Sequence, residues 1–150
     1  MEKNKSVSVL NSLITINNDR IQGYETATGE TEDQDLKTLF AQFIQTSRNC
    51  KNELITAVTK LGEEPNDGTR IDGEIYRVWM DFKALATGKD RKAILNSCEY
   101  GEDVAVKNYE KALKDEDLSP EHRSLVNSQF TKIKADHDKV RSLRDALVHA

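Results

Sequence analysis

Four side chains of this 150-residue sequence could bind a metal ion together if the fold brings them to one place. Three are carboxylates and one is an imidazole, and ligands of these kinds suit iron, manganese or zinc. The imidazole would be the only nitrogen donor of such a site. The candidate metal ligands are Glu25, Glu99, Glu102 and His137.

The sequence lacks the motif that builds a dinuclear carboxylate site in a four-helix bundle. Such sites draw a Glu-x-x-His motif from each of two helices, because inward side chains at one depth must share two ions. Thr56 stands three residues after Glu53, and Lys134 stands three residues before His137, so neither position completes the motif. No set of residues suited to nucleophilic catalysis is evident either. We therefore predict no catalytic residue, which favours a protein that is not an enzyme.

The same polar residues also have a purely structural interpretation. His137 would hydrogen-bond a carboxylate, while Glu25 and Glu99 would lie at the margins of the inward-facing stripes of their helices and reach water. The sequence favours this polar network, with a reduced iron or manganese site as the alternative.

Helices must position these side chains, because the composition favours little else. The chain has only 2 Pro and 7 Gly, and 32% of its residues are charged, which suits helices better than strands. Apolar residues recur at steps of three and four, as in amphipathic helices. Asp33 and Ser119 are predicted N-caps, and Gly62 is a predicted C-terminal glycine. The predicted helices cover about residues 6–28, 33–61, 73–86, 90–114 and 120–147.

The lengths of the connections predict how these helices pack. Tight turns near residues 30 and 117 make two antiparallel hairpins. Residues 62–88 contain a short helix and enough loop to span the bundle, so the second and third long helices can run parallel. Two antiparallel hairpins joined by one long crossover form the ferritin-like topology. We expect a single all-α domain over residues 1–150, a ferritin-like four-helix bundle.

Residues equidistant from a hairpin turn lie side by side, and this rule places the candidate ligands. His137 is predicted within two or three residues of Glu99. If the central helices are parallel, Glu25 lies with them within about two turns of one end of the bundle. Glu102 lies somewhat deeper. Two small polar residues are predicted beside it, Asn17 and Ser47.

Charge and hydropathy exclude several classes of protein. The 26 acidic residues outnumber the 22 Lys and Arg residues, so the basic surface that nucleic acids and anionic membranes require is missing. No apolar stretch is long enough to cross a bilayer or to act as a secretion signal. We expect a soluble, cytoplasmic protein with no nucleic-acid or membrane partner. Cys50 and Cys98 are predicted to be buried free thiols.

Several segments resemble a bacterial family of single-domain four-helix-bundle proteins. In chain order they are Ser8–Ile14, Leu61–Pro65, Trp79–Lys83, Cys98–Asp103 and Ala135–Asp138. The Cys-Glu-Tyr-Gly-Glu-Asp and Trp-Met-Asp segments are the most specific. The chain is similar to a domain-of-unknown-function family in the ferritin-like superfamily. The resemblance implies the ferritin-like fold with a helical crossover and no established activity, and three candidate ligands fall in its segments: Glu99, Glu102 and His137.

Two functions are consistent with these patterns. We expect a non-enzymatic stress or interaction protein that forms a homodimer or small homo-oligomer. The alternative is a non-haem protein that binds iron or manganese and has oxidase- or peroxidase-like activity. Its ligands would be Glu25, Glu99, Glu102 and His137.

Overall fold

The protein is helical throughout most of residues 2–65 and 91–148, the residues that the computed structural model describes. Their helices are α1 (Glu2–Glu30), α2 (Gln34–Lys60), α4 (Arg91–Lys114) and α5 (Pro120–Val148), and no strand occurs among them. The four long helices predicted from the sequence are thereby confirmed, although α1 begins at Glu2 rather than near residue 6. The short helix predicted over residues 73–86 lies outside the described residues.

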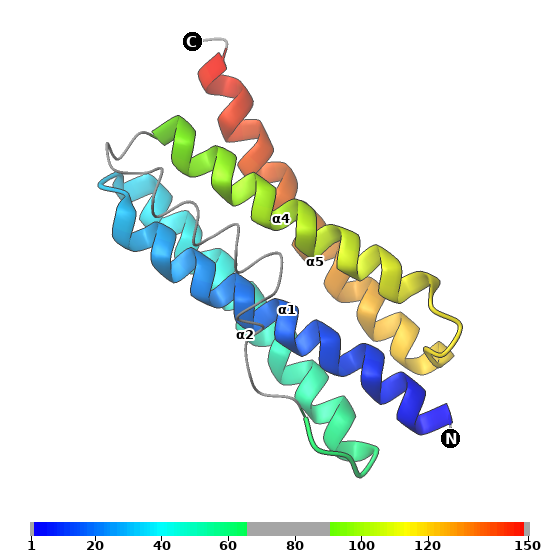
Figure 1. The fold of residues 1–150 in the computed structure, drawn as a ribbon. Coiled ribbons are helices and arrows are strands. Elements are labelled where there is room, and N and C mark those ends of the chain that lie inside the picture. Colours follow the sequence, from blue (N-terminus) through cyan, green and yellow to red (C-terminus); the bar gives the residue numbers. More distant parts are fainter. Residues whose placement is uncertain (1, 66–90, 149–150) are drawn as a thin grey trace.

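The four helices pack as two antiparallel hairpins, α1 with α2 and α4 with α5 (Figure 1). Hydrogen bonds at both ends of the molecule fix how the hairpins face each other. Arg91, at the start of α4, donates to Asp33 and Asp35 at the start of α2, at 3.0 and 2.8 Å. At the other end, Ser6 of α1 and His122 of α5 are hydrogen-bonded at 2.8 Å. The helices α2 and α4 therefore run in the same direction, as the connection lengths predict.

Local sequence signals end and begin these helices. Gly62 has a φ of 78°, a conformation that favours glycine because a Cβ atom would be strained there. Its N–H donates to the Thr59 carbonyl at 2.9 Å, and the next N–H reaches the Val58 carbonyl at 3.3 Å, which is the Schellman arrangement. Ser119 Oγ accepts the His122 N–H at 3.3 Å and so caps the N-terminus of α5.

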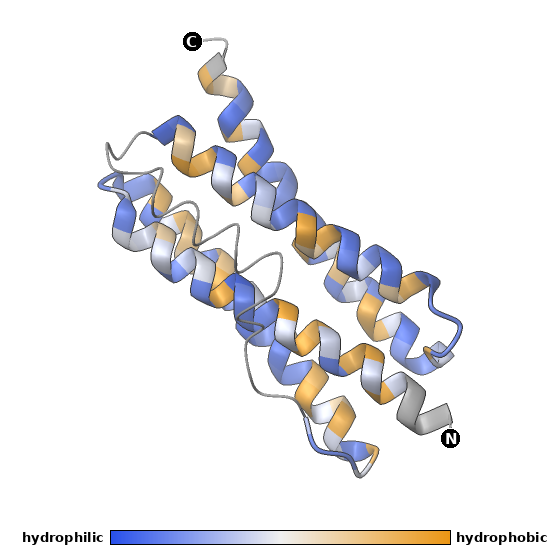
Figure 2. Cartoon of the chain, in the orientation of Figure 1, coloured by the Kyte–Doolittle hydropathy of each residue, from blue (hydrophilic) through white to orange (hydrophobic). Residues whose placement is uncertain are grey.

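The core lies along the inward stripes of all four helices. Figure 2 shows hydrophobic residues recurring along each helix between hydrophilic ones. Three inward positions are not taken by the neighbouring residue of the apolar pattern: Arg20 is buried more deeply than Ile21, Val58 more than Ala57, and Gln129 more than Phe130. Polar side chains occupy two of these positions because partners on neighbouring helices satisfy them, as described below.

The two cysteines behave as the sequence predicts. Cys50 and Cys98 are both buried and free. Burial raises the pKa of Cys50 to about 11 and that of Cys98 well above its usual value.

A separate prediction concerns membranes: none of the described helices combines the length and apolar character that a bilayer span requires.

Candidate functional site

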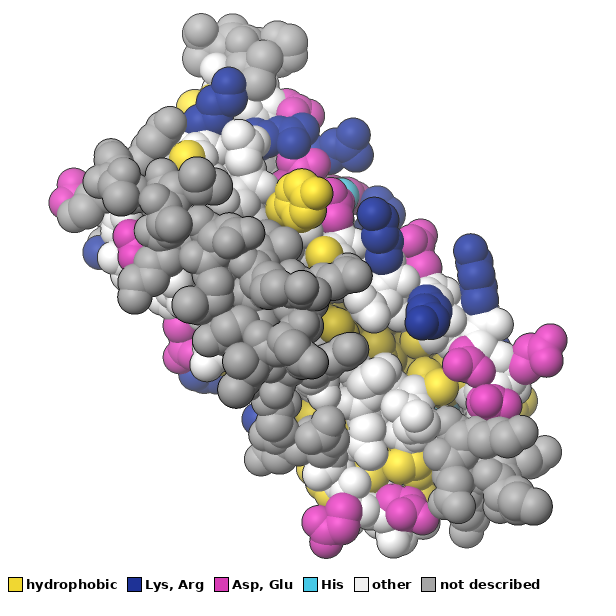
Figure 3. Space-filling model, in the orientation of Figure 1, with side chains coloured by type: hydrophobic (Ala, Val, Ile, Leu, Met, Phe, Trp, Pro, Cys, Tyr) yellow, Lys and Arg dark blue, Asp and Glu magenta, His cyan; other side chains and the backbone are white. Residues whose placement is uncertain are grey.

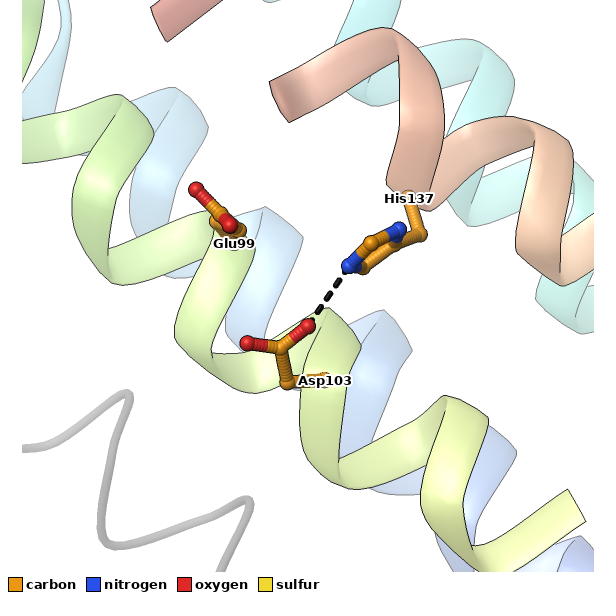
Figure 4. A group of neighbouring side chains, drawn as sticks. All are labelled: Glu99, Asp103 and His137. Carbon is orange, nitrogen blue, oxygen red and sulfur yellow. Dashed lines mark hydrogen bonds and ion pairs between the residues drawn. The ribbon is translucent and has the colours of Figure 1, made fainter. Parts of the chain in front are cut away.

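Three potential metal ligands meet on the flank of the bundle where α4 packs against α5. Glu99 and Asp103 are one helical turn apart on α4, and His137 faces them from α5 (Figure 4). Each offers one ligand atom, and these atoms all lie within 4.8 Å of one another. His137 Nε2 is 2.6 Å from Asp103 Oδ1. We refer to Glu99, Asp103 and His137 as the flank site.

A third carboxylate, that of Asp138, orients the imidazole of this group. His137 Nδ1 is 3.0 Å from Asp138 Oδ1, and Lys134 donates to the same carboxylate at 3.1 Å. The hydrogen bond from His137, helped by Lys134, lowers the pKa of Asp138. Asp138 accepts a hydrogen bond when Nδ1 carries a hydrogen, and the 2.6 Å contact of Nε2 with Asp103 needs a hydrogen between those two atoms, which must leave before Nε2 can bind a metal. A carboxylate behind a histidine in this way is the usual support of a metal-binding imidazole.

The remaining member of the flank site already has a cationic partner. Glu99 Oε2 forms an ion pair with Arg144 of α5. Arg144 also binds Asp145, from Nη2 at 2.8 Å. Acidic and basic side chains interleave along this edge of the molecule, with a histidine visible among them (Figure 3). The flank site therefore has charged neighbours, among them Arg144 and Asp138, and lies close to solvent on the side of Asp103.

A second charged cluster lies in the centre of the bundle and is built around Arg20 of α1. Its guanidinium donates from Nε and Nη2 to the two oxygens of Glu102 on α4, at 2.6 and 2.8 Å. It also donates to Ser47 of α2 at 2.5 Å and to Asp136 of α5 at 3.3 Å. The side chains of Arg20 and Glu102 are both fully buried. We refer to Arg20, Ser47, Glu102 and Asp136 as the central cluster.

Electrostatics holds Arg20 of the central cluster in its charged form. Burial opposes the charge of Arg20, but the attraction and hydrogen bonds of Glu102 outweigh that penalty and raise the pKa of Arg20. Burial also raises the pKa of Asp136 to about 6, while Arg20 acts in the opposite direction. Tyr24 adds a face for the cation, with its ring centroid 5.5 Å from the guanidinium carbon, a geometry that stabilises buried cations.

This arrangement does not fit a metal ion at the centre of the bundle. Both oxygens of Glu102 accept hydrogen bonds from Arg20, so a metal ion would have to share or displace the contacts of a fully buried guanidinium. A divalent cation placed there would also be repelled by the guanidinium in surroundings that screen charge poorly. The positive charge of Arg20 already balances the negative charge of the Glu102 and Asp136 carboxylates.

The structure thus separates the four residues that the sequence groups as candidate ligands. Glu99 and His137 meet, as the hairpin geometry predicts. Glu102 lies in the central cluster, beside Ser47 as predicted, and Glu25 has an exposed side chain outside the flank site. Asp103 takes the place that we assigned to Glu25 and Glu102. Its position one turn after Glu99, facing the same neighbouring helix, is the sequence signal that could have identified it.

Two further polar layers contain no charged donor at their centre. Tyr109 donates to Gln129 and accepts from Asn17, both at 2.8 Å, and Gln129 donates to Glu53 at 3.0 Å. The other layer lies beside the first turns of α1. The side chain of His122 is buried there, although a residue in the first turn of a helix is usually exposed. Ser6 and Ser119 both hydrogen-bond its Nδ1, at 2.8 Å each, and so satisfy this buried polar atom.

These features define an all-α four-helix bundle with polar layers in its core and an acidic group with one histidine on its flank. The chain belongs to the family described as "Domain of unknown function (DUF2383)", whose model matches residues 5–115. The predicted membership of a domain-of-unknown-function family is confirmed. The match includes α1, α2 and α4 and ends before α5, the helix that supplies His137. A comparison with curated protein sequences gives no match.

Proposed function

We propose that this protein is a ferritin-like bundle that binds one divalent transition-metal ion at the flank site and performs no redox catalysis at its centre. One observation carries the proposal. Ligand atoms of Glu99, Asp103 and His137, from two different helices, already lie within 4.8 Å of one another. An ion bound among them would connect α4 to α5 at mid-length.

The donor set indicates the class of metal. One imidazole nitrogen and two carboxylate oxygens suit Zn²⁺, Mn²⁺ or Fe²⁺, whereas Mg²⁺ and Ca²⁺ prefer oxygen ligands alone. His137 is buried but for 6% of its surface, and Asp138 holds its ring in one orientation. A preoriented imidazole loses little freedom when it binds a metal, which favours affinity at a small site.

The central cluster supports a role other than ferritin-type chemistry. Ferritin-like proteins place carboxylates and histidines together in the bundle core to hold two ions. In this chain Arg20 binds the carboxylates of Glu102 and Asp136 at that depth. The proposal therefore keeps the ferritin-like topology, which two antiparallel hairpins with parallel α2 and α4 support, and assigns the core a structural task.

Metal titration of the untagged protein tests this function. Isothermal titration calorimetry with Zn²⁺ should show one ion per chain. His137→Ala and Asp103→Asn should each weaken binding by about tenfold or more, since each removes a ligand. Glu110→Gln, which removes an exposed carboxylate of α4 outside the flank site, should leave binding unchanged. Binding that is absent, or equal in all four proteins, would contradict the proposal.

The oxidase alternative predicts a different result. If the protein were a non-haem oxidase, it would oxidise Fe²⁺ in air faster than the buffer alone, and His137→Ala would abolish the difference. We expect the wild-type protein to bind Fe²⁺ without accelerating its oxidation. Absorbance of the ferric product, followed for both proteins, distinguishes the two functions.

A further inference from the structure

The flank site contains a residue that competes with the metal for one of its ligands. Arg144 lies two helical turns after His137 on α5 and reaches back to Glu99 on α4. A guanidinium on this carboxylate balances the negative charge that a metal ion would otherwise balance. It also leaves less of the carboxylate available for coordination.

The exposure of this ion pair favours exchange of Arg144. The side chain of Arg144 is 25% exposed and that of Glu99 is 11% exposed, whereas Arg20 and Glu102 in the central cluster are both at 0%. Water reaches Arg144 and weakens its attraction to Glu99. An ion entering from solvent therefore meets a partner that it can displace.

Arg144 has a second acceptor ready when it leaves Glu99. Its Nη2 and Nε donate to Asp145 Oδ1 at 2.8 and 3.2 Å. The guanidinium can stay paired with Asp145 while the Glu99 carboxylate turns to a metal. Displacement then costs one of two ion pairs and does not leave the arginine without a counter-charge.

We propose that Arg144 is a built-in competitor that sets the metal affinity of the flank site. This inference rests on the proposed function, since it concerns the regulation of the same site. Arg144 and the ion exclude each other at Glu99, so each weakens the binding of the other by the same factor. In the metal-free protein Arg144 pairs with Glu99, and the metal ion displaces it only at a sufficient concentration.

Removing the competitor should strengthen metal binding. In calorimetric titrations with Zn²⁺ at pH 7 and low salt, Arg144→Gln should bind about tenfold more tightly than wild type, within the range common for coupled sites. Arg141→Gln is the matched control, because it removes the same charge from an exposed position of α5 three residues away. It should bind Zn²⁺ as wild type does.

Salt provides a second measurement of the electrostatic competition, and Arg141→Gln, measured at the same salt concentrations, shows how much a general charge effect contributes. Added salt screens the exposed Arg144–Glu99 pair, so the advantage of Arg144→Gln over wild type should shrink as the salt concentration rises. Arg144→Lys keeps a charge without the planar fork and should bind with intermediate affinity. Circular dichroism of each variant verifies that the helices are intact.

The possible outcomes separate this inference from the proposed function. Tighter binding by Arg144→Gln alone supports the competitor. Equal binding by wild type and Arg144→Gln overturns the competitor and leaves the metal site standing. Weaker binding by Arg144→Gln also overturns it, because Arg144 would then hold Glu99 in its ligating position. No binding by any of these proteins overturns both.

Discussion

The central cluster and the flank site solve the same electrostatic problem in different ways. Each holds a pair of carboxylates, Glu102 with Asp136 or Glu99 with Asp103, and each needs a positive charge beside it. In the centre the charge is Arg20, which is fully buried. On the flank it comes from Arg144, whose side chain is 25% exposed. The comparison leads us to expect that burial decides whether a counter-charge is permanent or exchangeable.

Removing the permanent charge should have the largest effect. Arg20→Met leaves Glu102 and Asp136 in the core without their partner, which should lower the free energy of unfolding by about 3–5 kcal/mol. Urea denaturation followed by circular dichroism measures this loss. Adding Glu102→Gln to Arg20→Met should recover part of it, because the second change removes the uncompensated charge. A loss below about 1 kcal/mol would show that the centre tolerates exchange as the flank does.

Binding of a metal ion at the flank site should have the next largest effect on stability. Zn²⁺ at about one hundred times its dissociation constant should stabilise the wild-type protein by about 2.7 kcal/mol, since the ion binds only the folded state. Thermal denaturation with and without Zn²⁺ measures the shift. Asp103→Asn should show little shift. An equal shift in this variant would place the ion elsewhere.

The hydrogen-bonded layer of Asn17, Tyr109 and Gln129 is buried but has no charged donor at its centre. A substitution there tests whether charge or burial contributes more to stability. Tyr109→Phe removes the hydroxyl that joins Asn17 to Gln129 and leaves both with an unmet hydrogen bond, at a cost of about 1–2 kcal/mol. Tyr100→Phe is the control, because Tyr100 is 67% exposed and should tolerate the same change. Denaturation curves of the two variants would coincide if the layer contributed nothing.

The smallest effect on stability is expected for Arg91, whose ion pairs are exposed to water. Arg91 binds Asp33 and Asp35, and all three side chains are substantially exposed. Arg91→Gln should cost less than about 1 kcal/mol, and the cost should fall further as salt is added. Arg48→Gln, an exposed change on α2, provides the baseline for unfolding experiments. A cost close to that of Arg20→Met would remove burial as the deciding variable.

The sequence predicts the framework well because helices and hairpins follow local rules. The spacing of apolar residues indicates the four helices, and distances from the turns place His137 near Glu99 and Ser47 near Glu102. Such rules locate backbone positions only. They say nothing of where a long side chain ends, which is why Arg20, whose guanidinium reaches three other helices, is missed.

The position of Glu25 shows a second limit of the prediction. Distance from a hairpin turn predicts the depth of a residue along the bundle, but the side of the helix on which its side chain lies depends on the rotation of the helix about its axis. Tyr24 points into the core and stacks near Phe43, with ring centroids 5.1 Å apart. The next residue then lies about 100° further around the helix, so Glu25 faces solvent. An apolar stripe that is interrupted by Asn17 and adjoins Arg20 does not define that rotation closely.

The central cluster also has a consequence for the order in which the chain folds. Arg20, Ser47, Glu102 and Asp136 come one from each described helix. The contact of Arg20 with Ser47 lies within the first hairpin, but its contacts with Glu102 and Asp136 close only after the two hairpins have docked. Each hairpin can form from neighbouring segments before that event. The complete cluster therefore forms late in folding, and it forms only when the two hairpins are correctly aligned. Substitutions at Arg20 should mainly accelerate unfolding and leave the folding rate nearly unchanged.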